Sequence, residues 1–219
     1  MKIDKKDFPK KSKHSHPVLK RLFDFFVSLF IILLLSWLIL IVLFLNLIMT
    51  LGRPFYFDVR VGYHGKTIKI LKFTTMKKNA NENAELYFTE EQKEDWKNER
   101  KVDNDPRVTK FGRILRKTSI DELPQLFNIL FGSLSFVGPR PITEQELEMH
   151  FTKEQQIELL SVKPGLTGNW ATSGRNNVEY QNGKRQELEL EYADNATIKN
   201  DLKIIRKTFK ALFDFNAVK

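Results

Sequence analysis

The chain has 219 residues and a formal net charge of +9, with 36 Lys and Arg residues against 27 Asp and Glu residues. This length accommodates one ordinary domain together with an anchor. The positive charge favours anionic partners such as acidic lipid, phosphorylated substrates or nucleic acid. Cysteine is absent, which excludes a disulfide framework and a thiolate nucleophile.

An apolar block stands out near the N-terminus. Residues 25–45 are almost all Leu, Ile, Val or Phe, and their insertion into a bilayer is favoured by about 5–10 kcal/mol. The block is too long and starts too late for a cleaved signal peptide, and it is too long for a core helix. We therefore predict a basic, disordered tail over residues 1–18 and a membrane anchor over residues 19–51. The anchor makes membrane lipids and phosphates better partners than nucleic acid.

The topology of this anchor follows from its flanks. Lys and Arg residues crowd both sides of the block, and basic residues near membrane segments tend to stay on the cytoplasmic side. A re-entrant hairpin keeps both clusters on that side, whereas a single span separates them. The block contains neither Pro nor Gly, so Ser36 is the candidate for the membrane break. We favour the hairpin, and the single span stays as the alternative.

The elements expected after the anchor begin with two strands, at residues 56–61 and 67–73, around the turn residues 62–65. Residues 77–103 form a charged surface insertion with a helix near residues 89–100. Asn104-Asp105-Pro106 is a turn and helix-start signal. The helix after it is basic and amphipathic. Its apolar face consists of Val108, Phe111, Ile114 and Leu115. The helix either packs this face on a core, with its basic face in solvent, or lies on anionic headgroups.

The second half of the chain is expected to be mostly helical. Helices are predicted at residues 123–131, 143–150 and 152–161, the last with a Thr152/Gln155 capping box. Residues 136–141 contain two prolines and are not helix interior. An amphipathic helix with apolar positions between Ile198 and Phe213 closes the chain. The fold class is therefore α+β and helix-rich, with a catalytic domain over residues 52–219.

Asp121 and Glu122 are adjacent carboxylates that admit three interpretations. Ser119 and Glu122 have the spacing of a capping box. Alternatively, Asp121 caps a helix whose first turn contains Pro124, and we prefer this assignment. A helix N-terminus, together with the cationic Arg116 and Lys117 nearby, would keep Asp121 ionised. An ionised carboxylate in a phosphate-binding environment is also what a nucleophile attacking phosphorus requires, and this is the third interpretation.

Groups that bind phosphate are the next candidates. Arg140 lies between Pro139 and Pro141, which fix the backbone around one guanidinium and suit bidentate phosphate binding. A surface arginine in a tight loop is the plainer interpretation. The glycine-containing loops at residues 163–168 and 173–177 include Arg175 and could cradle anions. No His or Cys spacing typical of a metal site occurs, so a divalent cation would be held by carboxylates and substrate phosphates, which suits Mg²⁺.

Together these motifs resemble the bacterial sugar transferase family, the monotopic phosphoglycosyl transferases, from about residue 19 to residue 215. The resemblance is specific because several motifs occur in order along the chain. They are Lys20-Arg21-x-x-Asp24, Lys72-Phe73-x-Thr75-Met76, Asp105-Pro106-Arg107-Val108-Thr109, Arg116-Lys117-Thr118-Ser119-Ile120-Asp121-Glu122-Leu123-Pro124-Gln125-Leu126, Gly138-Pro139-Arg140-Pro141 and Pro164-Gly165-x-Thr167-Gly168.

The resemblance implies an enzyme on the cytoplasmic face of the bacterial inner membrane, with a re-entrant helix and Mg²⁺. Asp121 would attack the β-phosphate of a UDP-sugar, release UMP and form an aspartyl-phosphosugar. Undecaprenyl phosphate would then accept the phosphosugar, starting capsule, exopolysaccharide or glycoprotein glycan synthesis. Asp121 and Glu122 would act at the metal, with Glu122 also able to accept a proton. The matched phosphate- or substrate-binding positions are Arg116, Arg140, Lys72, Arg107 and Arg175.

The chain departs from the family pattern at four places. Ser36-Trp37 stands where the family has Ser-Pro, and Asp58, Thr74 and Ala171 replace a Gln, an Arg and a Gln. The last three changes are expected to alter sugar or nucleotide contacts. Two rival functions are a non-catalytic basic module that binds acidic lipids or nucleic acid, and a membrane glycosyltransferase that releases UDP.

Overall fold

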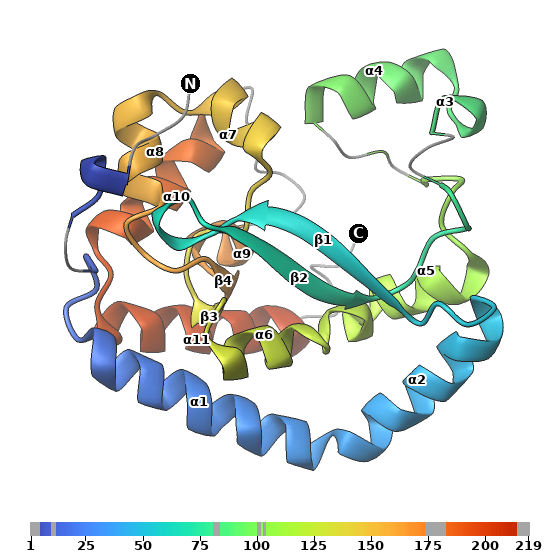
Figure 1. The fold of residues 1–219 in the computed structure, drawn as a ribbon, viewed down its shortest axis with the longest axis horizontal. Coiled ribbons are helices and arrows are strands. Elements are labelled where there is room, and N and C mark those ends of the chain that lie inside the picture. The colour runs from blue at the N-terminus through green and yellow to red at the C-terminus, as the bar shows by residue number, and fades with distance from the viewer. Residues whose placement is uncertain are drawn as a thin grey trace. The chain divides into compact units, whose positions relative to one another are not determined.

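The computed structural model describes residues 5–9, 12–80, 84–99, 102, 104–173 and 183–213. The fold is helix-rich α+β with two two-stranded sheets, β1–β2 and β3–β4 (Figure 1), as predicted. The chain divides into two compact units. Unit 1 comprises Met1–Phe30, Val59–Ile70 and Phe127–Lys219, and unit 2 comprises Ile31–Asp58 and Leu71–Leu126. The predicted domain boundaries remain a prediction.

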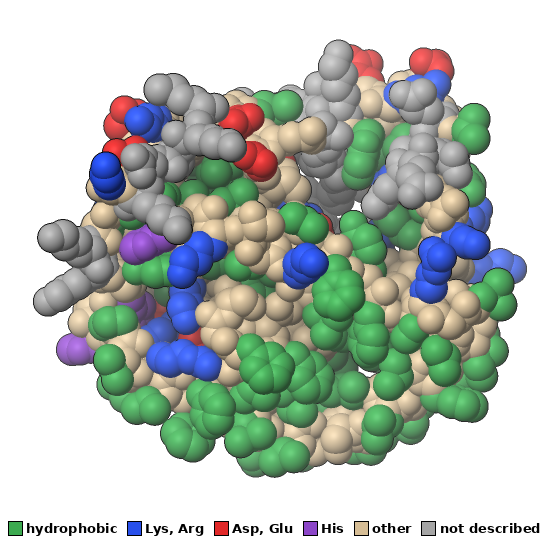
Figure 2. Space-filling model, viewed as in Figure 1, with side chains coloured by type: hydrophobic (Ala, Val, Ile, Leu, Met, Phe, Trp, Pro, Cys, Tyr) green, Lys and Arg blue, Asp and Glu red, His purple; other side chains and the backbone are tan. Residues whose placement is uncertain are grey.

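The apolar block forms two helices, α1 (Pro17–Leu34) and α2 (Ser36–Met49), which are bent by 66° relative to each other. The Ser36 hydroxyl donates a hydrogen bond to the carbonyl of Leu33 at 2.9 Å, a side-chain bond of the kind that accompanies helix bending. Within the described ranges no single helix meets the length and hydropathy required of a span, but the bent pair meets both together. Figure 2 shows hydrophobic side chains along both helices.

The predicted strands are confirmed as β1 (Phe55–Val61) and β2 (Thr67–Phe73), joined through the 3₁₀ turn η2 (Tyr63–Gly65). The charged segment that follows contains α3 (Ala84–Tyr87) and α4 (Glu90–Glu99), so the helix predicted near residue 89 is also confirmed. Residues 81–83 of this insertion lie outside the described residues.

In unit 2 the basic helix α5 (Lys110–Lys117) begins later than predicted. Thr109 is its N-cap and accepts a hydrogen bond from the Gly112 amide at 2.9 Å. The turn predicted at Asn104-Asp105-Pro106 is therefore confirmed, and the helix starts only after it. Leu115 is buried, but Ile114 is 59% exposed, which removes it from the predicted packing face. A Cβ at residue 112 would fall on the Thr75 carbonyl, so only glycine permits this close approach of α5.

Helices make up most of the described residues of unit 1, which includes most of α1. The others are α7 (Glu144–His150), α8 (Lys153–Leu159), α9 (Asn169–Thr172), α10 (Lys184–Asp194) and α11 (Ile198–Phe213), with η1 (Lys5–Asp7) near the N-terminus; α6 (Gln125–Phe131) begins in unit 2. Capping boxes start α7 and α8, and only the second was predicted. One core cluster contains Val137, Tyr192 and Ile204, and another contains Ile142, Phe151 and Leu159.

A second small sheet brings two sequence motifs together. Strand β3 (Ser135–Val137) pairs in parallel with β4 (Gly165–Thr167), with Ser135 opposite Gly165 and Val137 opposite Thr167. The Gly138 amide donates to the carbonyl of Thr167 at 2.9 Å, and the Gly165 amide donates to that of Pro139 at 2.8 Å. A Cβ at Gly138 would fall on the backbone at residues 163–165. The Gly-Pro-Arg-Pro loop is therefore fixed against the Pro-Gly-x-Thr-Gly loop.

The first turns of α1 are held in unit 1 by buried charges. Lys20 lies 3.5 Å from Asp24 and 3.1 Å from Asp201, and Asp24 accepts the Phe136 amide at 3.1 Å. Arg21 donates to the carbonyls of Ile129 and Leu130, at the end of α6. These contacts explain the Lys-Arg-x-x-Asp motif at the base of the anchor, because each charged group binds a partner outside α1.

The predicted tail also contributes to unit 1. His14 is buried and its Nε2 lies 3.1 Å from Asp201, so this residue of the basic tail packs in unit 1. Phe8 is buried in the cluster with Ile142. Disorder over the rest of residues 1–18 stays a prediction.

Candidate active site

Asp121 and Glu122 lie in a one-turn 3₁₀ helix, η3 (Ile120–Glu122), directly after α5. Ser119 precedes this turn in the left-handed region, with φ of 55°, which reverses the chain at the end of α5. The Ser119 side chain makes no capping bond, so no capping box forms. The preferred N-cap assignment of Asp121 was also wrong, because α6 begins at Gln125 and Asp121 lies inside η3.

An apolar base supports the two carboxylates within unit 2. Ile39 and Val42 of α2 form a buried cluster with Phe73 of β2 and Leu115 of α5. The residues that flank the carboxylates, Ile120 and Leu123, pack against this cluster, and Pro124 is fully buried. The carboxylate turn is therefore built on the second helix of the apolar block, which fixes its depth relative to that helix.

Two cations flank the same turn. Arg116 donates from Nε to the Thr75 hydroxyl at 3.0 Å, and Lys72 lies 3.7 Å from Asp58. Burial, followed by the charge of Glu122, raises the pKa of Asp121, whereas Lys72 and Arg116 act to lower it. The sequence predicts that neighbouring cations keep this carboxylate ionised. In the structure burial and Glu122 outweigh the two cations, so the pKa of Asp121 is raised and the group is more basic than an ordinary carboxylate. Its ionisation stays a prediction.

The raised pKa of Asp121 predicts a pH dependence. If Asp121 is the nucleophile that the family resemblance implies, it must lose its proton before it attacks. We therefore expect formation of the phosphosugar adduct to fail at acidic pH, with an acid limb above the ordinary aspartate pKa of about 3.9. Lys72→Gln removes a cation that lowers this pKa and should move the acid limb upward, while Lys72→Arg should not. Lys78→Gln, which changes an exposed lysine of unit 2, is the control. Adduct formation from UDP-sugar alone, measured against pH, tests the shift; a limb unmoved by Lys72→Gln contradicts it.

Arg107 is fully buried and its guanidinium is already engaged. It donates from Nε and Nη2 to the Asp105 carboxylate, at 2.9 and 2.7 Å, and lies 4.5 Å from the ring centres of Phe88 and Trp96. Burial acts to raise the pKa of Asp105, but its hydrogen bonds to Arg107 outweigh burial and lower it. These contacts tie the charged insertion to the turn before α5. A substrate contact for Arg107 stays a prediction.

Arg140 belongs to unit 1 and is positioned by two glutamates. Its amide donates to Glu189 at 2.8 Å, and its Nη1 donates to Glu146 at 3.3 Å. Glu146 also accepts from Arg60 at 3.0 Å and closes the capping box of α7. Burial raises the pKa of Glu189 to about 7. In Glu146 burial acts in the same direction, but Arg140 and then Thr143 outweigh it and lower the pKa.

Not every predicted site residue is described or brought together. Unit 2 contains Asp121 and the three charged residues that act on its pKa, which are Glu122, Arg116 and Lys72. Arg140 belongs to unit 1, and Arg175 lies outside the described residues. Sequence reasoning missed Thr75, Glu146 and Glu189, which hold the two arginines. Thr143-x-x-Glu146 was readable as a capping box; nothing in the sequence marks Glu189.

Comparisons with known proteins identify this arrangement of motifs. The sequence profile of the bacterial sugar transferases matches residues 15–215. The exopolysaccharide production protein ExoY of Rhizobium meliloti is 42% identical over 195 residues, which cover 88% of this chain and 84% of that protein.

Two longer relatives match through less than half of their length. The undecaprenyl-phosphate galactose phosphotransferase of Salmonella typhimurium is 40% identical over 203 residues, covering 92% of this chain and 42% of the relative. The UDP-glucose:undecaprenyl-phosphate glucose-1-phosphate transferase of Klebsiella pneumoniae is 37% identical over 207 residues, covering 91% and 41%. With a profile match over most of its length and a relative matched almost end to end, this chain belongs to the bacterial sugar transferase family.

Proposed function

We propose that this chain is a phosphoglycosyl transferase that moves a sugar-1-phosphate from a UDP-sugar to undecaprenyl phosphate. The observation that carries the proposal is the half-buried Asp121–Glu122 turn flanked by Lys72 and Arg116. A relative's name gives the same class of reaction, with UDP-glucose as donor and undecaprenyl phosphate as acceptor. The product would begin the assembly of an exopolysaccharide or related glycan.

The proposed reaction has two steps. An Asp121 carboxylate oxygen attacks the β-phosphorus of the UDP-sugar; the bond from that phosphorus to the bridging oxygen breaks, and UMP leaves. The phosphate oxygen of undecaprenyl phosphate then attacks the aspartyl-phosphosugar, frees the carboxylate and carries away the phosphosugar. Raised basicity in Asp121 favours the first step, and Arg116 and Lys72 lie where they can balance negative charge on phosphate. Arg140 is a further candidate for phosphate binding.

Mg²⁺ is the proposed cofactor. Among the described residues no three His, Cys, Asp or Glu side chains cluster as a metal site. A pair of carboxylates still fits, because Mg²⁺ commonly binds one or two carboxylates and completes its coordination with substrate phosphates and water. Asp121 and Glu122 would hold it, and the ion would neutralise charge on the diphosphate.

The bent helix pair supports attachment to the cytoplasmic side of the bacterial inner membrane as a re-entrant hairpin. The exposed surfaces of α1 and α2 are rich in large apolar side chains, including Phe26, Phe30, Trp37 and Leu40. A re-entrant hairpin uses the 66° bend between the two helices to return the chain to the side that it entered. In addition, α2 contributes Ile39 and Val42 to the apolar base of the carboxylate turn. Single cysteines introduced near residues 6 and 78 should both be labelled from the cytoplasmic side; labelling of residue 6 from outside only would rule out the hairpin.

Identifying the released nucleotide tests the reaction most directly. With UDP-sugar, undecaprenyl phosphate and Mg²⁺, the full chain should release UMP and form a lipid-linked phosphosugar. EDTA should abolish both, and added Mg²⁺ should restore them. Release of UDP would instead identify a glycosyltransferase without a phosphosugar intermediate. Lipid binding without any nucleotide release would favour the non-catalytic module.

A further inference from the structure

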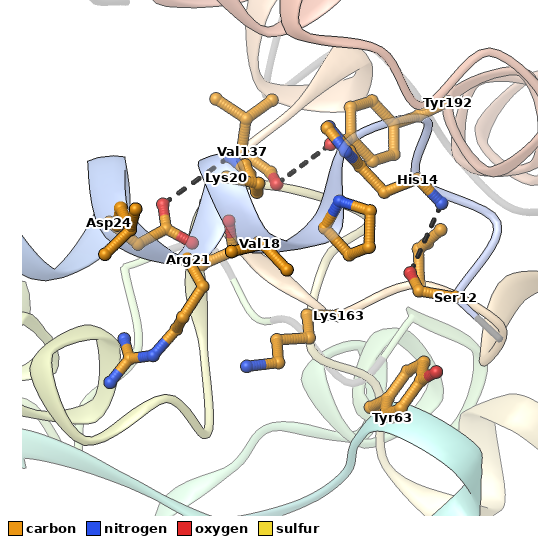
Figure 3. Close-up of a pocket in the computed structure, with 14 residues that line it drawn as sticks. Ser12, His14, Val18, Lys20, Arg21, Asp24, Tyr63, Val137, Lys163 and Tyr192 are labelled. Atoms are coloured by element: carbon orange, nitrogen blue, oxygen red, sulfur yellow. Dashed lines mark hydrogen bonds and ion pairs between the residues drawn. The ribbon is translucent and has the colours of Figure 1, made fainter.

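A cavity of about 390 Å³ lies in unit 1 beside the first turns of α1. Its walls come from the segment before α1, from α1 itself, from the Tyr63 turn, from β3 and from the residues before β4 (Figure 3). This volume is within the range of small-molecule sites, about 300–1,000 Å³. All the lining residues belong to unit 1, so neither Asp121 nor Glu122 contributes to it.

Lys163 supplies this cavity with a partly buried cation. No hydrogen bond or ion pair joins its ammonium to another residue in the described part of the chain, and the side chain is partly buried. Figure 3 shows Lys163 and Arg21 extending into the same space between α1 and the turn that carries Tyr63. Burial lowers the pKa of Lys163, and the charges of Arg21, Lys20 and Lys66 lower it further, against the opposing effect of Asp24. An anion in this space would offset both the burial and the repulsion.

The charged side chains that line the cavity favour an anion. Lys20, Arg21 and Lys163 line it, and Asp24, which pairs with Lys20, is the carboxylate among the described lining residues. The lining cations therefore outnumber the lining carboxylates. The phosphodiester of a phospholipid headgroup is an anion that such a lining can bind.

A buried hydroxyl provides an independent sign of a ligand. Ser135 is 1% exposed and lines the cavity, and its Oγ has no hydrogen-bond partner among the described residues. Buried hydroxyl groups normally have a partner, because leaving one unpaired costs about 1–3 kcal/mol. A phosphate oxygen is an acceptor that would provide it. The bonds from Arg21 to the carbonyls of Ile129 and Leu130 fix the guanidinium beside this space.

An apolar stripe leads away from the cavity along α1. Val18 and Leu22 line the cavity and are 73% and 48% exposed, and Phe26 and Phe30 continue at the same spacing with 61% and 64% exposed. Residues four apart lie on one face of a helix, so the stripe is continuous. A charged pocket that opens onto an apolar stripe matches an amphiphile with an anionic head and a long hydrocarbon chain.

We propose that this cavity binds the phosphodiester headgroup of an anionic phospholipid, with an acyl chain along the stripe of Val18, Leu22, Phe26 and Phe30. The lipid would neutralise Lys163 and hold the start of α1 to unit 1 without taking part in the reaction. This inference rests on the membrane attachment proposed above. It differs from the acceptor site because Asp121 has no place in the cavity.

Lipid titration of the full chain in maltoside micelles tests this, with the thermal midpoint as readout. Phosphatidylglycerol should stabilise the protein at a concentration at least about tenfold below that of phosphatidylcholine with the same acyl chains. Lys163→Gln should weaken the phosphatidylglycerol effect about tenfold, because it removes a charged hydrogen-bond donor. Lys163→Arg should retain it. Lys203→Gln, an exposed lysine of α11 outside the cavity, is the matched control and should behave as the unaltered chain.

A second variant separates binding from folding. Ser135→Ala removes one donor without changing charge and should weaken phosphatidylglycerol binding severalfold while the lipid-free midpoint stays within a few degrees. Equal phosphatidylglycerol responses for Lys163→Gln and the unaltered chain would overturn the proposal. The proposal would also be overturned if undecaprenyl phosphate displaced phosphatidylglycerol and bound Lys163→Gln more weakly. That result would identify the cavity as the site of the lipid acceptor. The lipid titration contains no sugar nucleotide and does not depend on the transfer reaction. If the chain released no UMP, the proposed function would fail and the lipid-binding result would still stand.

Discussion

Asp121→Asn is expected to lower phosphosugar transfer by at least about 1,000-fold, because the amide lacks the negative oxygen that would attack phosphorus. The change preserves the size of the side chain in the η3 turn, so the apolar base formed with Ile120 and Leu123 should persist. Two readouts separate chemistry from folding. Labelled UMP should exchange into UDP-sugar without any lipid acceptor in the unaltered chain and not in the variant, while their thermal midpoints remain similar.

Mapping the covalent adduct makes the same experiment decisive. After incubation with UDP-sugar alone, a peptide that contains Asp121 should carry the phosphosugar, and the corresponding peptide from Asp121→Asn should not. Glu90→Gln is the matched control, because it makes the same carboxylate-to-amide change on a highly exposed residue of unit 2. UMP exchange by Asp121→Asn at the unaltered rate would remove Asp121 as the nucleophile.

Local patterns predicted the parts of the fold that local forces determine. Alternation and turn residues predicted both strands of the first hairpin, the Thr152 capping box predicted the start of α8, and apolar periodicity predicted α11. The pairing of β3 with β4 was missed, because each strand has three residues and its partner lies about thirty residues away. Helix α10 was missed as well; its buried residues are few, and Glu189 is among them.

The turn with Asp121 and Glu122 shows why a correct motif did not give correct geometry. Asp121 was identified as the central carboxylate, but its position as a helix cap was wrong. Ser119 adopts a left-handed conformation that polar side chains only sometimes accept, and this starts a 3₁₀ turn where a regular helix was expected. The charge state was judged from neighbours in the sequence, Arg116 and Lys117. Burial under a tertiary fold is not visible there, and it dominates the pKa of Asp121.

The same difference between sequence neighbours and tertiary partners gives the largest expected effect on stability. Asp24 is 2% exposed; it pairs with Lys20 and accepts the Phe136 amide. Asp24→Ala removes the acceptor of that amide. It also removes one of the two carboxylates that pair with Lys20 among the described residues, so that Asp201 remains. Loss of one member of a buried pair costs about 3–5 kcal/mol. For a chain of this length that corresponds to a midpoint lowered by roughly 6–20 °C.

Asp24→Asn keeps an oxygen that can accept the Phe136 amide and removes only the charge, so its midpoint should fall less than that of Asp24→Ala. Glu187→Ala is the control, because its pair with Lys184 is exposed on both sides and such pairs contribute about 0–1 kcal/mol. Thermal unfolding of the three variants in the same micelles measures the differences. If Asp24→Ala unfolds at the same temperature as Glu187→Ala, these buried charges do not hold α1 to unit 1. The Lys-Arg-x-x-Asp motif would then need a role other than securing the base of the anchor.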